Sequence, residues 1–199
     1  MEISRAKIWF TQVKSFPTKY KCLKQQVFEF QNFKITPIRY KNRYEIMNWR
    51  NDQISILRQD NLLTKKIQDL YFESTIAKEF DLEKPNQILF SFFKKNKLIG
   101  YGGLVHIDWI NQNAEISFLL KTDLNNIEFY KQSFTAFLKL IEKIAINISM
   151  HKIYTYGYKT NEYRFSPIIN SFFEKEVELK NHKKINNDYI DILIHSKLL

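Results

Sequence analysis

The stretch that decides the fold is Leu98-Ile-Gly-Tyr-Gly-Gly-Leu-Val-His-Ile-Asp-Trp109, followed after a short break by Asn113-Ala-Glu-Ile-Ser-Phe-Leu-Leu120. Two runs rich in β-forming residues around a polar break are typical of an antiparallel hairpin. Three of the four glycines of the chain, Gly100, Gly102 and Gly103, lie in the first run. Because glycine weakens a strand interior, these three predict a bend or a close approach by a ligand or another backbone.

Upstream of this hairpin, the sequence predicts a strand, two helices and a second strand. Residues 34–40 are expected to form an edge strand, because Pro37 cannot donate to a central ladder. Residues 43–51 predict a short helix, and Thr64 can cap a helix that runs to residue 80. The helical period of that second helix places four side chains on one face: Ile67, Leu70, Tyr71 and Ser74. Residues 87–93 predict a strand that leads into the hairpin.

Downstream of the hairpin, a long apolar stripe with helical period predicts a helix over residues 127–149. A strand over 152–158 follows, and Pro167 suits the first turn of a last helix that ends near residue 174. Residues 176–180 and 189–196 are expected to pair as antiparallel strands. Antiparallel strands early in the chain and a strand–helix–strand crossover later predict a mixed α/β (α+β) fold.

Composition narrows the class of protein. The net charge of +10 favours anionic partners, but the basic residues are scattered and no nucleic-acid motif accompanies them, so nucleic acid is a minor alternative. Cys22 is the only cysteine, which excludes an intrachain disulfide. No apolar run approaches the ~20 residues of a membrane span, and the first residues do not form a secretory signal, so we expect no membrane contact and a cytoplasmic location. Residues 1–33 are set apart as a basic N-terminal arm with one short helix or strand over 27–30.

Segments in the rest of the chain carry a family resemblance through their order and spacing: residues 35–39, 46–52, 98–103, 114–120 and 188–195. Together they resemble the GNAT N-acyltransferase superfamily, in the branch of ribosomal-protein and amino-sugar N-acetyltransferases. The resemblance covers residues 34–199. It implies a GNAT-like domain with a central mixed, mostly antiparallel sheet of about six to seven strands and about four helices on both faces.

The resemblance also implies an acyl-CoA donor, acetyl-CoA or a longer acyl-CoA, and an amine acceptor. In such folds strand 116–120 would splay from strand 152–158 and bond the pantetheine arm through its unpaired backbone. The pyrophosphate would lie at the start of the helix at residue 127. The loop over 121–127 departs from the family pattern, because it has neither glycine nor arginine. The residues expected to bind the cofactor are Ser117, Phe118, Leu119, Leu120, Lys121, Asn125, Asn126, Ile127 and Asn161.

Three residues are candidates for catalysis. Glu115 is the first candidate, since amide formation needs a neutral amine and therefore a base; the alternative is a carboxylate that faces solvent or pairs with a lysine. If 109–112 form the turn, His106 lies opposite Glu115 and Asp108 opposite Asn113, whereas a one-residue slip sends Glu115 to the other face. The resemblance implies a tyrosine that protonates the leaving thiolate, and Tyr163 is placed in that role. No two histidines have ligand spacing, so no metal is expected.

The expected acceptor-binding residues are Trp49, Arg50, Asn51, Arg58, Asp108 and His195. The resemblance and the net charge of +10 imply a small anionic amine as acceptor, namely a nucleotide-linked amino sugar, whose phosphates the arginine fork would suit. Two alternatives stay open: a protein N-terminal amine of the ribosomal-protein type, and a non-catalytic ligand-binding module on the same scaffold. A polyamine fits a basic protein poorly. A homodimer is a further open possibility.

Overall fold

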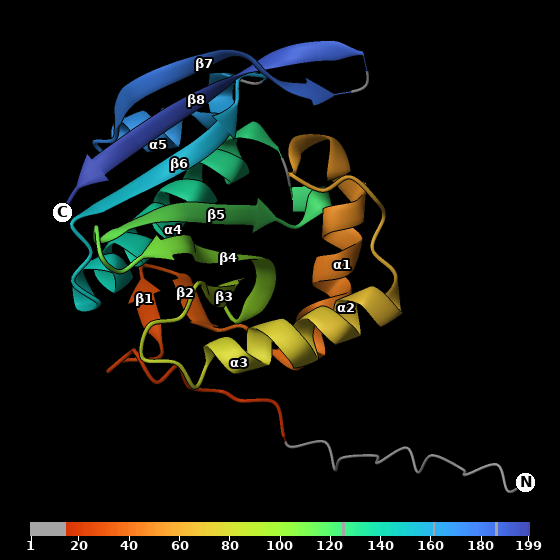
Figure 1. Ribbon diagram of the computed structural model, residues 1–199, viewed down its shortest axis with the longest axis vertical. Coiled ribbons are helices and arrows are strands. Elements are labelled where there is room, and N and C mark those ends of the chain that lie inside the picture. Colours follow the sequence, from red (N-terminus) through yellow and green to blue (C-terminus); the bar gives the residue numbers. More distant parts are fainter. Residues whose placement is uncertain (1–14, 125, 161, 186) are drawn as a thin grey trace, which may run out of the picture.

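The computed structural model describes residues 15–124, 126–160, 162–185 and 187–199 (Figure 1). They form one sheet of eight strands in the order β1-β2-β3-β4-β5-β6-β8-β7, in which β5 and β6 are parallel and all other neighbours antiparallel. The strands are β1 Phe28–Phe30, β2 Phe33–Pro37, β3 Ile88–Lys94, β4 Lys97–Asp108, β5 Asn113–Leu120, β6 Lys152–Tyr158, β7 Glu174–Ile185 and β8 Asp188–Leu198.

Helices flank this sheet, with α1, α2 and α3 on one side and α4 and α5 on the other (Figure 1). Their bounds are α1 Arg43–Asp52, α2 Lys65–Tyr71, a π-helical turn Phe72–Ile76, α3 Ala77–Glu79, α4 Ile127–Asn147 and α5 Ser166–Asn170. Short 3-10 turns cover Tyr40–Asn42, Ile54–Ile56, Thr122–Leu124 and Glu162–Arg164. Among the described residues, no helix combines the length and apolarity that crossing a membrane requires.

The predicted mixed α+β fold and the order of its elements are confirmed, with two differences. The sheet has eight strands instead of six or seven, because Phe28–Phe30 also forms a strand and pairs with β2. The strand that contains Pro37 therefore lies between β1 and β3 and is not the edge strand that the sequence predicts. The last helix ends at Asn170, and β7 already begins at Glu174, where the sequence predicts the helix to end. The chain reverses at Phe172, which has a positive φ of 63° and cannot continue a right-handed helix.

The buried face of the helix after Thr64 is not the face that carries Ile67, Leu70, Tyr71 and Ser74. Thr64 does cap it, since its Oγ1 accepts a hydrogen bond from the backbone N–H of Ile67. The buried side chains, however, are those of Gln68, Phe72 and Ile76. The four side chains predicted to share one face, those of Ile67, Leu70, Tyr71 and Ser74, are exposed or half-exposed. Ile67 and Tyr71 line a cleft described below, which explains apolar residues outside the core.

The described part of the N-terminal segment packs into the core. Tyr20, Leu23 and Phe28 are buried, and the Tyr20 ring stacks on Phe80 with centroids 3.9 Å apart. The Tyr20 hydroxyl donates to the carbonyl of Leu89 and accepts from its N–H, at 3.1 and 3.0 Å. Burial raises the pKa of this phenol. A division of the chain after residue 33 stays a prediction.

The glycines of β4 allow the strands beside them to approach closely. A Cβ at Gly102 would lie 2.1 Å from the carbonyl oxygen of Ser117 in β5, and one at Gly103 would lie 1.9 Å from that of Ile88 in β3. Any side chain there would force the central strands apart. Of the explanations that the sequence offers for these glycines, close approach by another backbone is therefore confirmed.

Candidate active site

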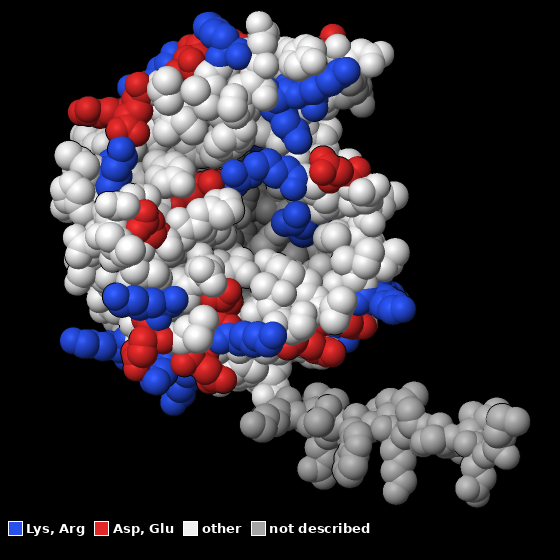
Figure 2. All heavy atoms as spheres, viewed as in Figure 1, with Lys and Arg blue, Asp and Glu red and all other residues white. Residues whose placement is uncertain are grey.

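An opening lies between the two parallel strands β5 and β6. They pair from Asn113 opposite Lys152 to Ile116 opposite Thr155, and their remaining residues are unpaired with each other. A cleft of about 880 Å³ occupies this opening, and Figure 2 shows a hollow with Lys and Arg side chains at its rim. The cleft is lined by residues of α1 and α2 and also of α4 and α5, so it runs through the sheet from one face to the other.

The backbone of β5 faces this opening with unused hydrogen-bonding groups. The carbonyl oxygens of Ser117 and Leu119 lie against the glycines of β4. Because N–H and C=O groups of successive strand residues alternate between the two edges, those of Phe118 lie on the edge that faces the opening. The carbonyl of Leu120, on the same edge, accepts a hydrogen bond of 2.9 Å from the Gln53 amide. Phe118, which has no pairing partner in β6 among the described residues, therefore directs its backbone N–H and C=O toward the opening, where an extended ligand could use them.

Glu115 and His106 meet where β5 and β6 begin to diverge. The Glu115 side chain is only 7% exposed, and its Oε2 lies 2.9 Å from Nδ1 of His106. The His106 ring is 62% exposed and, like Glu115, lines the cleft. With Nδ1 facing a carboxylate, the favoured tautomer carries its proton there, which leaves Nε2 as the acceptor nitrogen of a ring that lines the cleft.

A β-bulge brings these two side chains together. Asp108 lies opposite Asn113 as predicted, but Val105 and not His106 lies opposite Glu115, because β4 carries one extra residue between Val105 and Asp108. His106 has a positive φ of 49° at this bulge. The left-handed backbone redirects its imidazole onto Glu115, so the expected contact forms in a register that simple counting does not give.

Arg58 makes the second contact of Glu115. It comes from the loop between the Ile54–Ile56 turn and α2, and its guanidinium donates to Oε1 of Glu115. It also lies over the ring of Tyr156 in β6, 4.6 Å from the ring centroid. The Glu115 carboxylate is therefore paired with an arginine and a histidine, and not with a lysine, as the alternative interpretation of the sequence predicts.

Arg50 lies in the same cleft with neutral partners. It donates to Oε1 of Gln59 at 2.9 Å and to the hydroxyl of Tyr101 at 2.8 Å. None of the ion pairs between described residues involves it. Among the described residues that line the cleft, Arg50, Arg58 and Arg164 are the arginines and Glu115 is the single carboxylate. The electrostatic character of the cleft is thus positive.

Two tyrosines of β6, Tyr156 and Tyr158, line the cleft on the same face of the sheet as Glu115. Tyr154 lies opposite Glu115 in the parallel pairing, and Tyr156 and Tyr158 follow at the two-residue period of a strand. The Tyr158 hydroxyl is buried with no hydrogen-bond partner among the described residues. Burial raises the pKa of Tyr158, which keeps the phenol protonated at neutral pH. This hydroxyl can therefore donate a proton to a group in the cleft.

Around the start of α4, two lysines, of which Lys121 is a predicted cofactor residue, already have partners. Lys121 pairs with Asp123 at 2.8 Å, and Lys131 pairs with Glu128 at 3.6 Å. The Asn126 side chain caps the helix by accepting from the N–H of Phe129. Ile127, at the first helical position, is exposed.

Arg164 is a further cation near this helix start. Its guanidinium lies 5.1 Å from the ring centroid of Tyr130, in the second turn of α4, and it lines the cleft. Its Nε is buried with no partner among the described residues. Burial raises the pKa of Tyr130 to about 12, so the neighbouring phenol stays neutral and does not offset the arginine charge.

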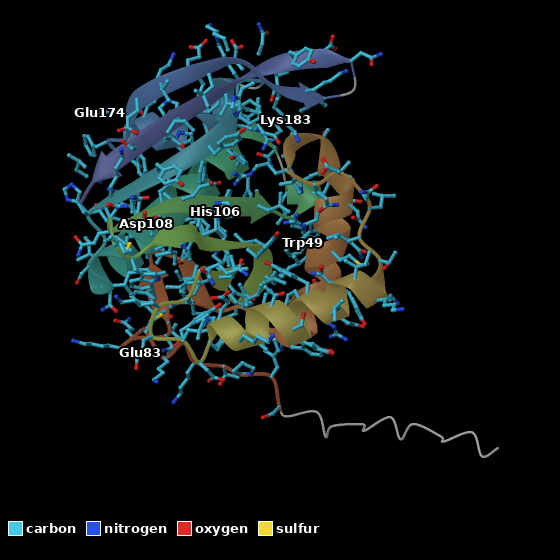
Figure 3. All side chains as sticks on the ribbon, in the orientation of Figure 1. Trp49, Glu83, His106, Asp108, Glu174 and Lys183 are labelled. Atoms are coloured by element: carbon cyan, nitrogen blue, oxygen red, sulfur yellow. The ribbon has the colours of Figure 1, made fainter. Side chains whose placement is uncertain are left out.

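The structure keeps several predicted site residues away from the cleft. Trp49 is buried in the core, and the Asn51 amide holds Leu63 through hydrogen bonds of 2.9 and 2.8 Å. Asp108 accepts from the N–H groups of Ile110 and Asn111 at the end of the β4–β5 pair, beyond His106 in Figure 3. The others outside the cleft lining are Tyr163, His195, Leu119, Leu120, Lys121, Asn126 and Ile127.

Two more predicted cofactor residues, Asn125 and Asn161, lie outside the described residues. His195 is buried beside Phe165, with ring centroids 5.4 Å apart. Its Nδ1 has no partner in the described part of the chain, and burial lowers the pKa of the ring. The predicted residues that do meet in the cleft are Glu115, His106, Arg50, Arg58, Ser117 and Phe118.

Sequence reasoning missed Arg164, Tyr101, Gln59 and the β6 tyrosines. The alternation of Tyr154, Tyr156 and Tyr158 in a predicted strand could have indicated an aromatic face. No local signal marks Gln59 or Tyr101, because their roles depend on contacts between distant segments. Within the described ranges, no group of three histidine, cysteine or acidic side chains is placed to hold a metal ion.

Comparisons with known proteins agree with this geometry. The family model described as "Acetyltransferase (GNAT) domain" matches residues 35–194. Among curated proteins, no sequence matches the chain.

Solved structures resemble the chain over most of its length. A spermidine N-acetyltransferase from Vibrio cholerae, in complex with CoA and spermine, has a TM-score of 0.72 at 17% identity, covering 85% of this chain and 96% of its own. RimL, a ribosomal L7/L12 α-N-protein acetyltransferase in complex with CoA, gives 0.72 at 12% identity, with 87% and 98% covered. The ribosomal-protein-S5-alanine acetyltransferase from Vibrio fischeri gives 0.69 at 17% identity, with 87% and 97% covered.

Proposed function

The chain belongs to the GNAT acetyltransferase family, and we propose that it transfers the acetyl group of acetyl-CoA to the amine of a small, negatively charged acceptor. The observation that carries the proposal is the position of Glu115 and His106. Both lie where β5 and β6 diverge, on the side of the opening that Arg50 and Arg58 also line. A thioester held along β5 and an amine in the arginine-lined half of the cleft would meet beside this pair.

We assign the role of base to His106, and the role of positioning residue to Glu115. The amine nitrogen must lose a proton as its bond to the thioester carbonyl carbon forms, and Nε2 of His106 is the acceptor nitrogen of a ring that lines the cleft. Glu115 fixes the ring through Nδ1 and stabilises the imidazolium that results. When the carbon–sulfur bond breaks, the thiolate needs a proton, and the Tyr158 hydroxyl fits that role better than Tyr163, which lies outside the cleft.

The residues present suit a CoA donor. Phe118 offers one backbone N–H and one C=O to the pantetheine arm, as an added strand would use them. For the diphosphate, Arg164 and the free N–H groups at the start of α4 supply the positive charge that the loop over 121–127 lacks. Arg164 is thus the substitute for the missing arginine of the family loop.

The charged residues that line the cleft indicate the class of acceptor. One carboxylate, itself already paired, and three arginines line the described cleft, so a polycation such as spermine would meet net repulsion. An amine that carries phosphate or carboxylate would be attracted, and a nucleotide-linked amino sugar is such a molecule. The ribosomal-protein type of acceptor, a peptide N-terminal amine, is the second candidate, favoured by the likeness to RimL.

Calorimetry and an acetylation assay test the proposal. Acetyl-CoA should bind, and mass spectrometry should detect an added acetyl group on anionic amino sugars in preference to spermine or a neutral peptide. Acetylation of a peptide N-terminus alone would move the conclusion to the second candidate. No binding of acetyl-CoA at millimolar concentration would overturn the enzymatic proposal and favour a non-catalytic module.

A further inference from the structure

Arg58 bridges the two strands that diverge at the candidate active site. Its guanidinium pairs with Glu115 of β5 and lies over Tyr156 of β6, 4.6 Å from the ring centroid. The side chain is 42% exposed, whereas that of Glu115 is 7% exposed. Arg58 therefore spans the entrance of the opening from the solvent side, with a buried carboxylate beneath it.

The loop that carries Arg58 is held on both sides of it. Before it, Gln53 donates to the carbonyl of Leu120 at 2.9 Å. After it, Asn51 bonds both backbone groups of Leu63 at 2.9 and 2.8 Å, and Asp60 lies 3.8 Å from Lys183 of β7, which Figure 3 places near this loop. The Arg58 side chain can thus change partners while its backbone stays in place.

The contact with Arg58 has a chemical consequence for Glu115. Both carboxylate oxygens are engaged, one by Arg58 and one by His106. As long as Arg58 holds Oε1, the negative charge of Glu115 is shared between two partners and stabilises an imidazolium less. A phosphate or carboxylate in the cleft would compete for the guanidinium, because it offers two oxygens to the arginine fork and stays partly solvated.

Arg50 shows where such an anion would be held. It lines the same cleft, and its two protein hydrogen bonds go to the neutral groups of Gln59 and Tyr101. Gln59 follows Arg58 directly in the chain. An anionic group bound by Arg50 would therefore lie close to the loop from which Arg58 extends.

We propose that Arg58 is a specificity-determining residue that makes the Glu115–His106 pair respond to the acceptor's charge. A phosphate or carboxylate of the acceptor draws the Arg58 guanidinium away from Glu115, which opens the entrance and leaves the carboxylate to His106 alone. A neutral amine leaves Arg58 on Glu115, and the base is weaker. This inference rests on the proposed acetyltransferase function for its kinetic consequence but not for the movement itself.

The movement can be followed by NMR without any turnover. The chain has six arginines, so a sample labelled with ¹⁵N-arginine gives few Nε–Hε signals, and the Arg58 signal is the one lost in Arg58→Lys. The three probes carry the same amino group on the sugar ring: glucosamine 6-phosphate adds a phosphate, muramic acid adds a carboxylate, and glucosamine has no acidic group. We expect the Arg58 signal to shift with one or both anionic probes, which also tells phosphate from carboxylate. No shift with either, or an equal shift with glucosamine, would overturn the proposal.

Kinetics supply the second measurement. Arg58→Met should lower kcat/KM for the preferred anionic probe by about tenfold or more and raise it for glucosamine, so the ratio between them falls. Arg58→Lys should retain part of the ratio, since it keeps the charge without the fork. Arg39→Met is the matched control, because Arg39 stacks on Phe93 outside the cleft and should leave the ratio unchanged.

The two proposals fail in different ways. If the wild-type enzyme acetylates none of the three probes, the acceptor class under the proposed function is wrong, while the NMR titration still decides whether Arg58 responds to anions. If the wild type prefers an anionic probe and Arg58→Met keeps the same preference, the acetyltransferase stands and the role of Arg58 is overturned. Circular dichroism shows whether the Met variant is folded before it is assayed.

Discussion

The two edges of strand β5 have opposite constructions. On one edge, β5 pairs with β4 from Gly100 opposite Leu120 to Val105 opposite Glu115, and the glycines of β4 bring the backbones together. On the other edge, pairing with β6 stops at Ile116 opposite Thr155, and a cleft follows. One strand thus contributes a closed edge to the stability of the sheet and an open edge to the site.

This difference shows how a fold can keep unpaired backbone at a site without losing its core. On the closed edge, the backbones of β4 and β5 lie so close at the glycines of β4 that a side chain there would force the strands apart. The open edge is surrounded by tyrosine and arginine side chains that can shift, so it can admit a ligand. Substitutions should therefore affect stability on the closed edge and binding or turnover on the open one.

The largest expected effect is on the closed edge. A Cβ at Gly102 would lie 2.1 Å from the backbone carbonyl oxygen of Ser117 in β5, whereas one at Gly157 in β6, beside the opening, would lie 2.6 Å from the edge of the Phe165 ring, which can move. Gly102→Ala should lower the free energy of unfolding by roughly 3 kcal/mol or more, and Gly157→Ala by less than about 1.5 kcal/mol. Urea unfolding of both variants measures this, and equal losses would contradict the contrast.

On the open edge, the largest effect should be on turnover. His106→Gln and Glu115→Gln should each lower kcat by about 10²-fold or more, since general base catalysis contributes that much. Acetyl-CoA affinity, measured by calorimetry, should stay nearly the same. His151→Gln, an exposed histidine outside the cleft, is the control. Unchanged kcat in Glu115→Gln would remove Glu115 from the mechanism.

A smaller effect is expected where the donor enters. Arg164→Gln should weaken CoA binding by about tenfold, because it removes a charge-assisted contact to the diphosphate. Pantetheine, which lacks the diphosphate, should bind the variant and the wild type alike. Lys131→Gln is a matched control, since Lys131 already pairs with Glu128. Equal losses for CoA and pantetheine would place Arg164 elsewhere than at the diphosphate.

The smallest effect concerns pH and the far edge of β6, which pairs with β8. Burial, and secondly Lys175, lower the pKa of His195, so the folded state takes up a proton less readily than the unfolded chain. Stability should therefore fall as the pH drops below about 6.5, with a slope of at most about 1.4 kcal/mol per pH unit. Thermal unfolding of the wild type and His195→Asn, in buffers from about pH 7.5 to about pH 5, checks this, and identical slopes would contradict it.

The sequence predicts the closed edge better than the open one. The hairpin and helix α4 follow from local patterns, because strand and helix periods are set by residues near in the chain. The contact of Glu115 with His106 was expected, but the bulge that makes it was not, since a bulge depends on how two strands fit. Arg58 and Arg164 reach the cleft through loops, whose paths no local pattern specifies. The helical period gives the side chains of α2 that share a face but not which face is buried, because a cleft wall and a core can both be apolar.

The left-handed backbone at His106 lowers the stability of the folded state, and folding alone would not require a histidine at this position. A non-glycine residue with positive φ costs of order 1 kcal/mol, and glycine is the residue that adopts this conformation most readily. His106→Gly should therefore melt at a higher temperature than the wild type while losing its base. The histidine at this position lowers the stability of the fold in return for a catalytic group. Laboratory selection of this protein for heat resistance alone should therefore replace His106 among its first substitutions.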